Sequence, residues 1–287
     1  MADARAQIQP TEAVTEDELA STVIPGDPRH KIDHRSQPTN AFAELMSRKR
    51  PKNDILPEEP RRSKPMVYDR RDGLRAYTKD PTAYGPERVI YHNDRFVVIN
   101  DLFPKSTVHT LILPRDTTKH VLHPFDAFED PVFVADVQEE VKKVRHLVAK
   151  ELRRKHGKYS ATDQARFAAM DQNDPPDPLP EGRDWDKEII TGIHAVPSMN
   201  HLHVHVLSRD MRGEYMKRYN HYNSFTTPFL IDVNDFPLAR DDVRRHPGRE
   251  GYLKSDMVCW RCGMNFRNRM KDLIQHLEKE FLAWRGE

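Results

Sequence analysis

Three histidines at alternate positions are the residues of this sequence best suited to chemistry. They are His201, His203 and His205, and aliphatic residues separate them. Side chains two positions apart in a β-strand point to the same face, so the three imidazoles would stand in a row about 6–7 Å apart. Imidazole has an unperturbed pKa of about 6.5, which leaves a large neutral, nucleophilic fraction at pH 7. The pattern predicts a strand with one chemical face and one packed face.

Two alternatives to a nucleophilic site stay open at this point. One is a half-buried strand with histidines on its wet face, and the other is a zinc site held by alternating histidines. The preceding segment, residues 192–200, combines a glycine, a proline, His194, Ser198 and an asparagine. A turn of this composition can direct backbone amides and a hydroxyl toward an anion, as oxyanion and phosphate sites require. This favours chemistry at a phosphate over a metal site.

A second group of residues has the spacing of metal ligands. Cys259 and Cys262 form a Cys-x-x-Cys pair, and His276 and Glu280 follow four residues apart. Residues four apart share one face of a helix, so two thiolates, an imidazole and a carboxylate could complete a tetrahedral zinc site. The alternative is a redox pair, which needs a thioredoxin-like context that the sequence lacks. We therefore predict one structural zinc ion.

The hydrophobic pattern predicts the elements that position these residues. Strands are expected at 88–91, 95–99, 108–114, 188–194, 201–207 and 229–233. Apolar residues at helical spacing predict an amphipathic helix over 131–156, and the metal site requires a second helix over about 269–284. Residues 157–184 are polar and contain several prolines, so we expect a flexible insertion there.

Composition sets the limits of the folded part. Only 37% of the 287 residues are hydrophobic and the mean hydropathy is −0.82, which is low for a chain folded along its whole length. Residues 1–65 are rich in charged residues and proline without sustained periodicity, and we expect a disordered tail. The net charge is +1, so affinity for nucleic acid would have to come from clustered charge.

The tail contains two short motifs. Residues 40–46 place apolar side chains on one face of a short helix, which is either a chance pattern or a docking site for a protein partner. The basic run at 48–52 predicts a nuclear localisation signal. No apolar run approaches the roughly 18 residues of a membrane helix, and the first residues do not resemble a signal peptide. We expect a nuclear protein without a membrane partner.

Residues 192–207 resemble the histidine-triad family of nucleotide hydrolases and transferases, whose signature is three alternating histidines followed by two apolar residues. Within that family, His194 and Ser198 ahead of the triad are similar to those of aprataxins, which remove AMP from adenylated DNA 5′ ends. Residues 259–284 are similar to the C-terminal finger of fungal aprataxins. The resemblance covers roughly residues 65–287. It implies an α+β fold, with an antiparallel histidine-triad sheet and flanking helices over 66–235 and a linker and small zinc finger over 236–287.

The resemblance also implies catalytic roles. His203 would attack the phosphorus of AMP and form a covalent histidyl-AMP, and His194 would protonate the departing DNA phosphate. The phosphate would be held by Ser198 and His205, and by a lysine in the loop 101–105, which resembles the nucleotide-pocket loop of the family. The implied catalytic set is Lys105, His194, Ser198, His201, His203 and His205. No catalytic metal is expected.

Adenylated nicked or broken DNA and AMP are the implied partners. Basic, aromatic and amide side chains alternate after the triad, in a composition that suits phosphates and stacked bases. The implied DNA contacts are Tyr68, Arg70, Lys217, His221, Ser224, Arg261 and Arg267. The competing hypotheses are a small-molecule nucleoside phosphoramidase or dinucleoside polyphosphate hydrolase, and a DNA-end scaffold that binds nucleotide without catalysis.

Overall fold

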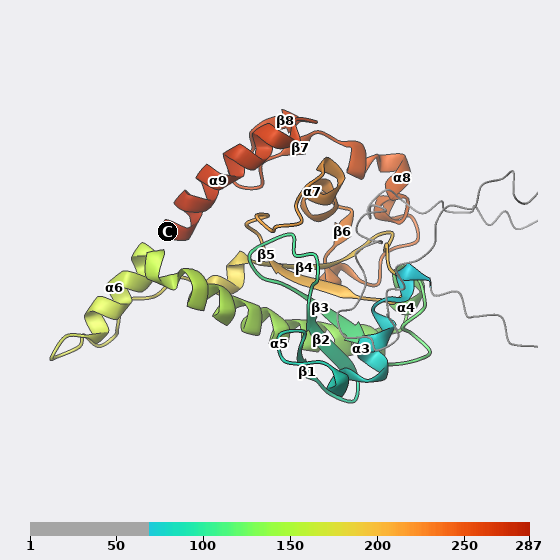
Figure 1. Cartoon of the computed structure of the whole chain (residues 1–287), viewed down its shortest axis with the longest axis horizontal. Coiled ribbons are helices and arrows are strands. Elements are labelled where there is room, and N and C mark those ends of the chain that lie inside the picture. The colour runs from blue at the N-terminus through green and yellow to red at the C-terminus, as the bar shows by residue number, and fades with distance from the viewer. Residues whose placement is uncertain (1–68) are drawn as a thin grey trace, which may run out of the picture.

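The computed structural model describes residues 69–287 (Figure 1). The predicted contact residue Tyr68, the docking helix at 40–46 and the basic run at 48–52 lie outside the described residues and stay predictions. No helix within 69–287 is long and apolar enough to cross a membrane.

A six-stranded antiparallel sheet forms the centre of the described chain, with strand order β1-β2-β3-β5-β4-β6. Its strands are β1 (Val89–His92), β2 (Phe96–Asn100), β3 (His109–Pro114), β4 (Ile189–His194), β5 (Val204–Ser208) and β6 (Leu230–Ile231). The first two expected strands form a hairpin, with β1 paired to β2 across the turn at Asn93 and Asp94. The triad strand β5 lies between β3 and β4, in the middle of the sheet.

The helices are α3 (Arg75–Lys79), α4 (Pro124–Ala127), α5 (Pro131–His156), α6 (Ala161–Met170), α7 (Tyr219–Thr226), α8 (Pro247–Glu250) and α9 (Met270–Gly286). The chain enters the fold through a short 3-10 turn, η1 (Arg70–Asp72). A second 3-10 turn, η4 (Trp185–Glu188), leads into β4.

Helix α5 packs on one face of the sheet and has the predicted bounds. Asp130 caps its first turn by accepting from the backbone N–H groups of Val132 and Phe133, and Pro131 occupies the first helical position. Its apolar side chains join Val204 and Val206 of β5 in the main core. Val132 and Leu147, two of the apolar residues whose helical spacing predicted this helix, are instead 69% and 42% exposed.

The other face of the sheet carries two smaller clusters. One packs α3 against β2 and β3, and the other packs the triad strand against α7 and the C-terminal finger. The finger consists of β7 (Met257–Val258), β8 (Asn265–Arg267) and α9, and its α9 also sends Phe281 and Trp284 into the main core. The finger is therefore packed on the domain that contains the six-stranded sheet, with the end of α9 beside α6 (Figure 1).

The expectation of a flexible insertion at 157–184 is wrong in its first half. Residues 161–170 form helix α6, whose first turn is capped by Ser160. Asp163 is fully buried and accepts from the indole N–H of Trp185 at 2.8 Å. The polar composition hid this helix because its stabilising contacts are polar and come from distant parts of the chain.

The core of α5 provides a test of the packing. Leu152 is fully buried, so Leu152→Ala should lower the free energy of unfolding by about 2–5 kcal/mol through lost burial and a residual cavity. On the same helix Leu147 is 42% exposed, and Leu147→Ala should change it by no more than about 0.5 kcal/mol. Urea unfolding of both variants measures the difference. Equal losses would contradict the assigned packing of α5.

Candidate active site and zinc centre

The triad is only partly a strand. Strand β5 begins at Val204, where pairing with Ile112 of β3 begins, so His201 and His203 precede the strand. The expected row of three strand residues is therefore wrong, because the backbone pairing between β3 and β5 extends no further than Val204. The backbone N–H of Leu202 donates to the carbonyl of His120 instead.

A compact histidine cluster nevertheless forms on the sheet face opposite α5. The ring centroids of His203 and His205 are 5.0 Å apart, and those of His194 and His205 are 4.5 Å apart. Phe225 of α7 packs edge-on against His194 and His205. The ring of His201 lies apart, stacked on His120 at 4.7 Å and hydrogen-bonded to the carbonyl of Pro114 at 3.0 Å. The structure thus groups His194, His203 and His205.

A hydrogen-bond chain determines which nitrogen of His205 carries the proton. The backbone N–H of Lys105 donates to Nδ1 of His109 at 3.2 Å, so the proton of the neutral His109 ring is on Nε2. That nitrogen lies 2.9 Å from Nδ1 of His205, to which it donates, and 3.4 Å from a carboxylate oxygen of Asp101. The neutral His205 ring therefore carries its proton on Nε2. Within the described residues this Nε2 is buried without a hydrogen-bond partner, so it can donate to an anion.

The tautomer of His203 follows in the same way. Its Nδ1 lies 2.7 Å from the backbone carbonyl of His201, and a carbonyl can only accept, so Nδ1 carries the proton. The other nitrogen, Nε2, then bears the free lone pair of the neutral ring. This is the form of imidazole that can attack an electrophilic phosphorus.

Burial keeps these rings uncharged. It lowers the pKa of His203, although the hydrogen bond to His201 and the charge of Asp101 act in the opposite direction. Burial and the positive potential of neighbouring groups hold the pKa values of His194 and His205 well below 6.5. For His109, burial outweighs the nearby Asp101 and lowers the pKa to about 4. Near neutral pH the cluster is a set of neutral donors and acceptors.

The loop that carries Lys105 is held by a buried carboxylate. Asp210 is 1% exposed and accepts from both the backbone N–H and the hydroxyl of Thr107. Gly213 packs so closely that an added methyl group would collide with the backbone of Pro104 and Lys105. The ammonium of Lys105 donates to the carbonyl of Phe103 at 3.1 Å. Its positive charge contributes to lowering the pKa values of His194 and His205.

The loop that carries Ser198 is tied to the start of the described chain. The guanidinium of Arg71 in η1 donates to the carbonyl of Ser198 at 2.9 Å. The side-chain amide of Asn200 donates to the carboxylates of Asp69 and Asp72. These contacts position the predicted phosphate-binding hydroxyl from two sides. The predicted DNA contact Arg70 belongs to the same turn and is exposed.

The remaining predicted DNA contacts fall into two groups. Lys217 and Arg267 are exposed and accessible to a ligand. His221 and Ser224 lie in α7 and are each only 2% exposed, with the Ser224 hydroxyl donating to the carbonyl of His221. Arg261 forms ion pairs with Glu280 of α9 and with Glu287, which follows the helix. Burial and pairing make these three residues less suited to direct contact with DNA than the first two.

The second predicted constellation forms a compact ligand set. One ligand atom each from Cys259, Cys262 and His276 lies within 4.8 Å of the other two, and Sγ of Cys262 is 3.1 Å from Nε2 of His276. These donors and separations fit a tetrahedral zinc site. The knuckle turns at Gly263, whose φ of 75° favours glycine. Glu280 stands one helical turn beyond His276, with a carboxylate oxygen 3.4 Å from its Nε2.

Within residues 69–287 one other group could geometrically hold a metal ion, formed by Asp101, His109 and His205. The 2.9 Å contact between the two imidazoles is a hydrogen bond that already uses both facing nitrogens. This favours the hydrogen-bonded arrangement, and the expectation of no catalytic metal stays a prediction.

Two of the site residues were not singled out by the sequence. His109 is a lone polar side chain in an apolar strand, and Asp210 follows the triad strand without a motif of its own. The spacing of His109 in its strand could have indicated its role. His109 is two positions from Leu111, which pairs with His205, so both side chains lie on the same face of the sheet as His205. Asp210 has no comparable signal, because its partner Thr107 is 103 residues away.

Known proteins share this combination of fold and finger. Residues 77–221 match the family described as scavenger mRNA decapping enzyme C-term binding, and residues 226–283 match the C2HE/C2H2/C2HC zinc-binding finger family. An aprataxin-like protein of Saccharomyces cerevisiae is 34% identical over 223 residues, which are 74% of this chain and 95% of that protein. An aprataxin-like protein of Schizosaccharomyces pombe is 32% identical over 247 residues, covering 85% of this chain and 94% of that protein.

A solved structure gives the same result. The aprataxin ortholog Hnt3 in complex with DNA aligns with a TM-score of 0.58 and 28% identity, covering 75% of this chain and 96% of that one. The fold and site are therefore those of a nucleotide-hydrolase type of enzyme with a histidine-triad-like domain and a C-terminal zinc finger. Within that class, the chain belongs to the aprataxin family.

The buried histidines predict a loss of stability in acid. Burial lowers the pKa values of His109 and His201 to about 4, while in the unfolded chain they titrate near 6.5. Below pH 6.5 these histidines bind protons in the unfolded chain, whereas the buried rings of the folded protein stay neutral. The free energy of unfolding therefore has its full value above that pH and decreases toward pH 4. The melting temperature should therefore fall between about pH 7 and pH 4.5.

A pair of variants tests the origin of this acid sensitivity. His201→Asn removes one buried imidazole and should flatten the dependence of Tm on pH, while replacement of the exposed His92 by Asn should leave the slope unchanged. The same slope in wild type and His201→Asn would show that the buried ring does not carry the effect.

Proposed function

We propose that this protein removes AMP from 5′-adenylated DNA through a covalent histidyl-AMP intermediate, leaving a 5′-phosphate end. The observation that carries the proposal is the hydrogen bond from Nδ1 of His203 to the carbonyl of His201, which leaves the Nε2 lone pair available for attack. Membership of the aprataxin family and the match to a DNA-bound ortholog structure support the choice of substrate.

In the first step, Nε2 of His203 forms a bond to the AMP phosphorus, and the bond from that phosphorus to the bridging oxygen of the DNA 5′-phosphate breaks. The Nε2–H of His205 is placed to donate to a nonbridging oxygen, where negative charge develops. The ammonium of Lys105 adds positive charge to the same cluster. In the second step, a water oxygen forms a bond to phosphorus, the bond from phosphorus to Nε2 of His203 breaks, and AMP leaves. The proton that the water loses passes to His194, which gave up its proton in the first step, and the neutral His203 ring is regenerated.

His194 is proposed to give a proton to the departing DNA phosphate. In the free protein, burial holds its pKa well below 6.5, so the ring is neutral near pH 7. A bound adenylate brings negative charge into the pocket, and a nearby negative charge raises the pKa of an imidazole. Protonation of His194 would then accompany substrate binding, and the site would be charged only when a leaving group is present.

Contacts outside the pocket are needed to distinguish DNA from the many metabolites that contain AMP. We assign them to the exposed Arg70, Lys217 and Arg267, which lie at the start of the described chain, ahead of α7 and on the finger. A small-molecule adenylate hydrolase is the competing proposal, and the finger packed on the catalytic fold argues against it. The nuclear location suggested by residues 48–52 is proposed on the sequence alone.

The nucleophile can be tested on a 5′-adenylated nicked duplex. Replacement of His203 by Ala should reduce AMP release by at least about a hundredfold, because loss of a nucleophile normally costs several orders of magnitude. Denaturing wild-type protein in mid-turnover should trap AMP on His203, detectable by mass spectrometry. Retention of more than about a hundredth of the wild-type turnover would exclude the covalent mechanism.

The metal assignment makes a separate prediction. We propose that Cys259, Cys262 and His276 hold one structural zinc ion, with Glu280 as the fourth ligand. Elemental analysis should find about one zinc per chain. Cys259→Ala should lose this zinc, whereas simultaneous replacement of the three triad histidines by alanine should keep it. Zinc lost from the triad variant would instead support a metal site at the histidine cluster.

A further inference from the structure

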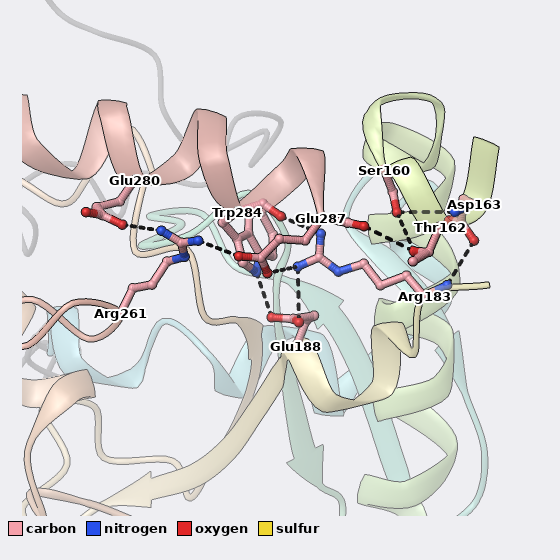
Figure 2. Close-up of polar contacts among 9 residues, drawn as sticks. All are labelled: Ser160, Thr162, Asp163, Arg183, Glu188, Arg261, Glu280, Trp284 and Glu287. Atoms are coloured by element: carbon pink, nitrogen blue, oxygen red, sulfur yellow. Dashed lines mark hydrogen bonds and ion pairs between the residues drawn. The ribbon is translucent and has the colours of Figure 1, made fainter. Parts of the chain in front are cut away.

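Helix α6 and the chain that returns from it contact the far end of the finger helix. Helix α9 continues for ten residues beyond the predicted zinc ligand His276, well past the length that the metal site needs. At that end the backbone N–H and hydroxyl of Thr162 donate to the carbonyl of Glu287 (Figure 2). The segment that precedes β4 is therefore bound to the finger.

Arg183 lies at the centre of this contact. Its guanidinium group is 4.4 Å from the ring centroid of Trp185 and 4.9 Å from that of Trp284, and it donates to the backbone carbonyl of Trp284. It also pairs with Glu188 at 3.1 Å, and only 7% of its side chain is exposed. A planar cation can lie against two indole rings while its edge binds oxygen atoms, which a lysine cannot reproduce.

The arginine is held from the α6 side by a buried carboxylate. Asp163 accepts from the backbone N–H of Arg183 at 3.2 Å and from the indole N–H of Trp185 at 2.8 Å. On the other side, the indole N–H of Trp284 donates to Glu188 at 2.7 Å. Figure 2 shows Asp163 of α6, Arg183 and Glu188 of the segment before β4, and Trp284 of α9 converging. Each partner of Arg183 is thus fixed by a second contact.

The same network continues to both functional sites. Glu287 pairs with Arg183 at 3.7 Å and with Arg261, and Arg261 also pairs with Glu280 beside His276 (Figure 2). In the opposite direction, Glu188 directly precedes β4, whose last residue is His194. Ion pairs and stacked rings therefore link the zinc centre to the strand that carries a residue of the active site.

We propose that Arg183 is a positioning residue that fixes the zinc finger relative to the histidine cluster, so that one DNA end contacts both. This inference rests on the proposed function, because it assigns the finger to DNA. A finger already held in its binding orientation loses less conformational freedom when DNA binds. Loss of Arg183 should therefore weaken capture of adenylated DNA and leave the chemistry in the pocket intact.

The kinetic test uses the full-length, zinc-loaded protein. For Arg183→Ala, KM for a 5′-adenylated nicked duplex should rise about tenfold or more, while kcat at saturating DNA stays within about twofold. Turnover of a small AMP ester, which cannot reach the finger, should also stay within about twofold. The matched control is Arg154→Ala, which removes an exposed arginine paired with Glu151 on α5 and should change none of these values.

Hydrogen exchange gives a readout that does not depend on activity. In Arg183→Ala, the amides of residues 278–286 should exchange at least about tenfold faster, while those of α5 should keep their protection. Trp284→Phe, which keeps an aromatic ring but loses the bond to Glu188, should show a smaller change in the same direction. If Arg183→Ala loses zinc or fails to fold, Trp284→Phe provides the test of the positioning role.

The outcomes separate the two proposals. If the wild type releases no AMP from adenylated DNA, the proposed function fails, and hydrogen exchange still tests whether Arg183 holds the finger. If the wild type is active but Arg183→Ala lowers turnover of DNA and of the small ester equally, the residue supports only the fold. Unchanged KM for DNA, or unchanged exchange at residues 278–286, would overturn the positioning role.

Discussion

A histidine ring can be buried at low cost only while it is uncharged and its N–H has an acceptor. This constraint shapes the centre of the molecule, because β5 places apolar side chains toward α5 and His205 on the opposite face. The hydrogen bonds from Lys105 through His109 to His205 meet this constraint at His109 and fix one proton on each ring. At His205 the Nε2–H has no acceptor within the described residues, and a bound phosphate could supply one.

The finger extends the same core and is not an appended module. Leu273 and Leu277 of α9 pack with Leu207 of the triad strand, and Cys259 is buried in the same cluster. Binding of zinc to this segment would therefore stabilise the catalytic fold as well as the finger, since metal binding and folding share one free energy. It also means that the orientation of the finger is set by side-chain packing along α9 together with the polar contacts at its end.

The sequence was most informative where local signals agreed with the final packing. The apolar spacing predicted helix α5 over about 131–156, and the structure has it at Pro131–His156, where the Asp130 cap and Pro131 support the same start. The strands and the cysteine–histidine cluster were predictable for similar reasons, and the α+β fold with a C-terminal finger is confirmed. Helix α6 was missed, because only distant residues such as Trp185 reveal that Asp163 is buried.

The departures within the site have the same cause. The alternating spacing alone predicted three equivalent histidines. The pairing of β5 with β3 starts only at Val204, and the ring of His201 stacks on His120 outside the cluster. Burial of His221 and Ser224 could not be read from a polar segment, because it depends on the docking of α7 under the finger. The local sequence pattern identifies the reactive histidines. The residue that sets the tautomer of His205, however, is His109, which lies 96 positions earlier in the chain.

The bond between Arg71 and Ser198 joins residues 127 positions apart, and His109 meets His205 across 96 positions. Contacts of such separation require long stretches of chain to be ordered before they form, and they form late during synthesis. A nascent chain that ends before Leu202 can contain the whole of α5 and four strands of the sheet, yet it lacks His203, the proposed nucleophile. The proposed reactive centre is thus completed only after most of its scaffold has been made.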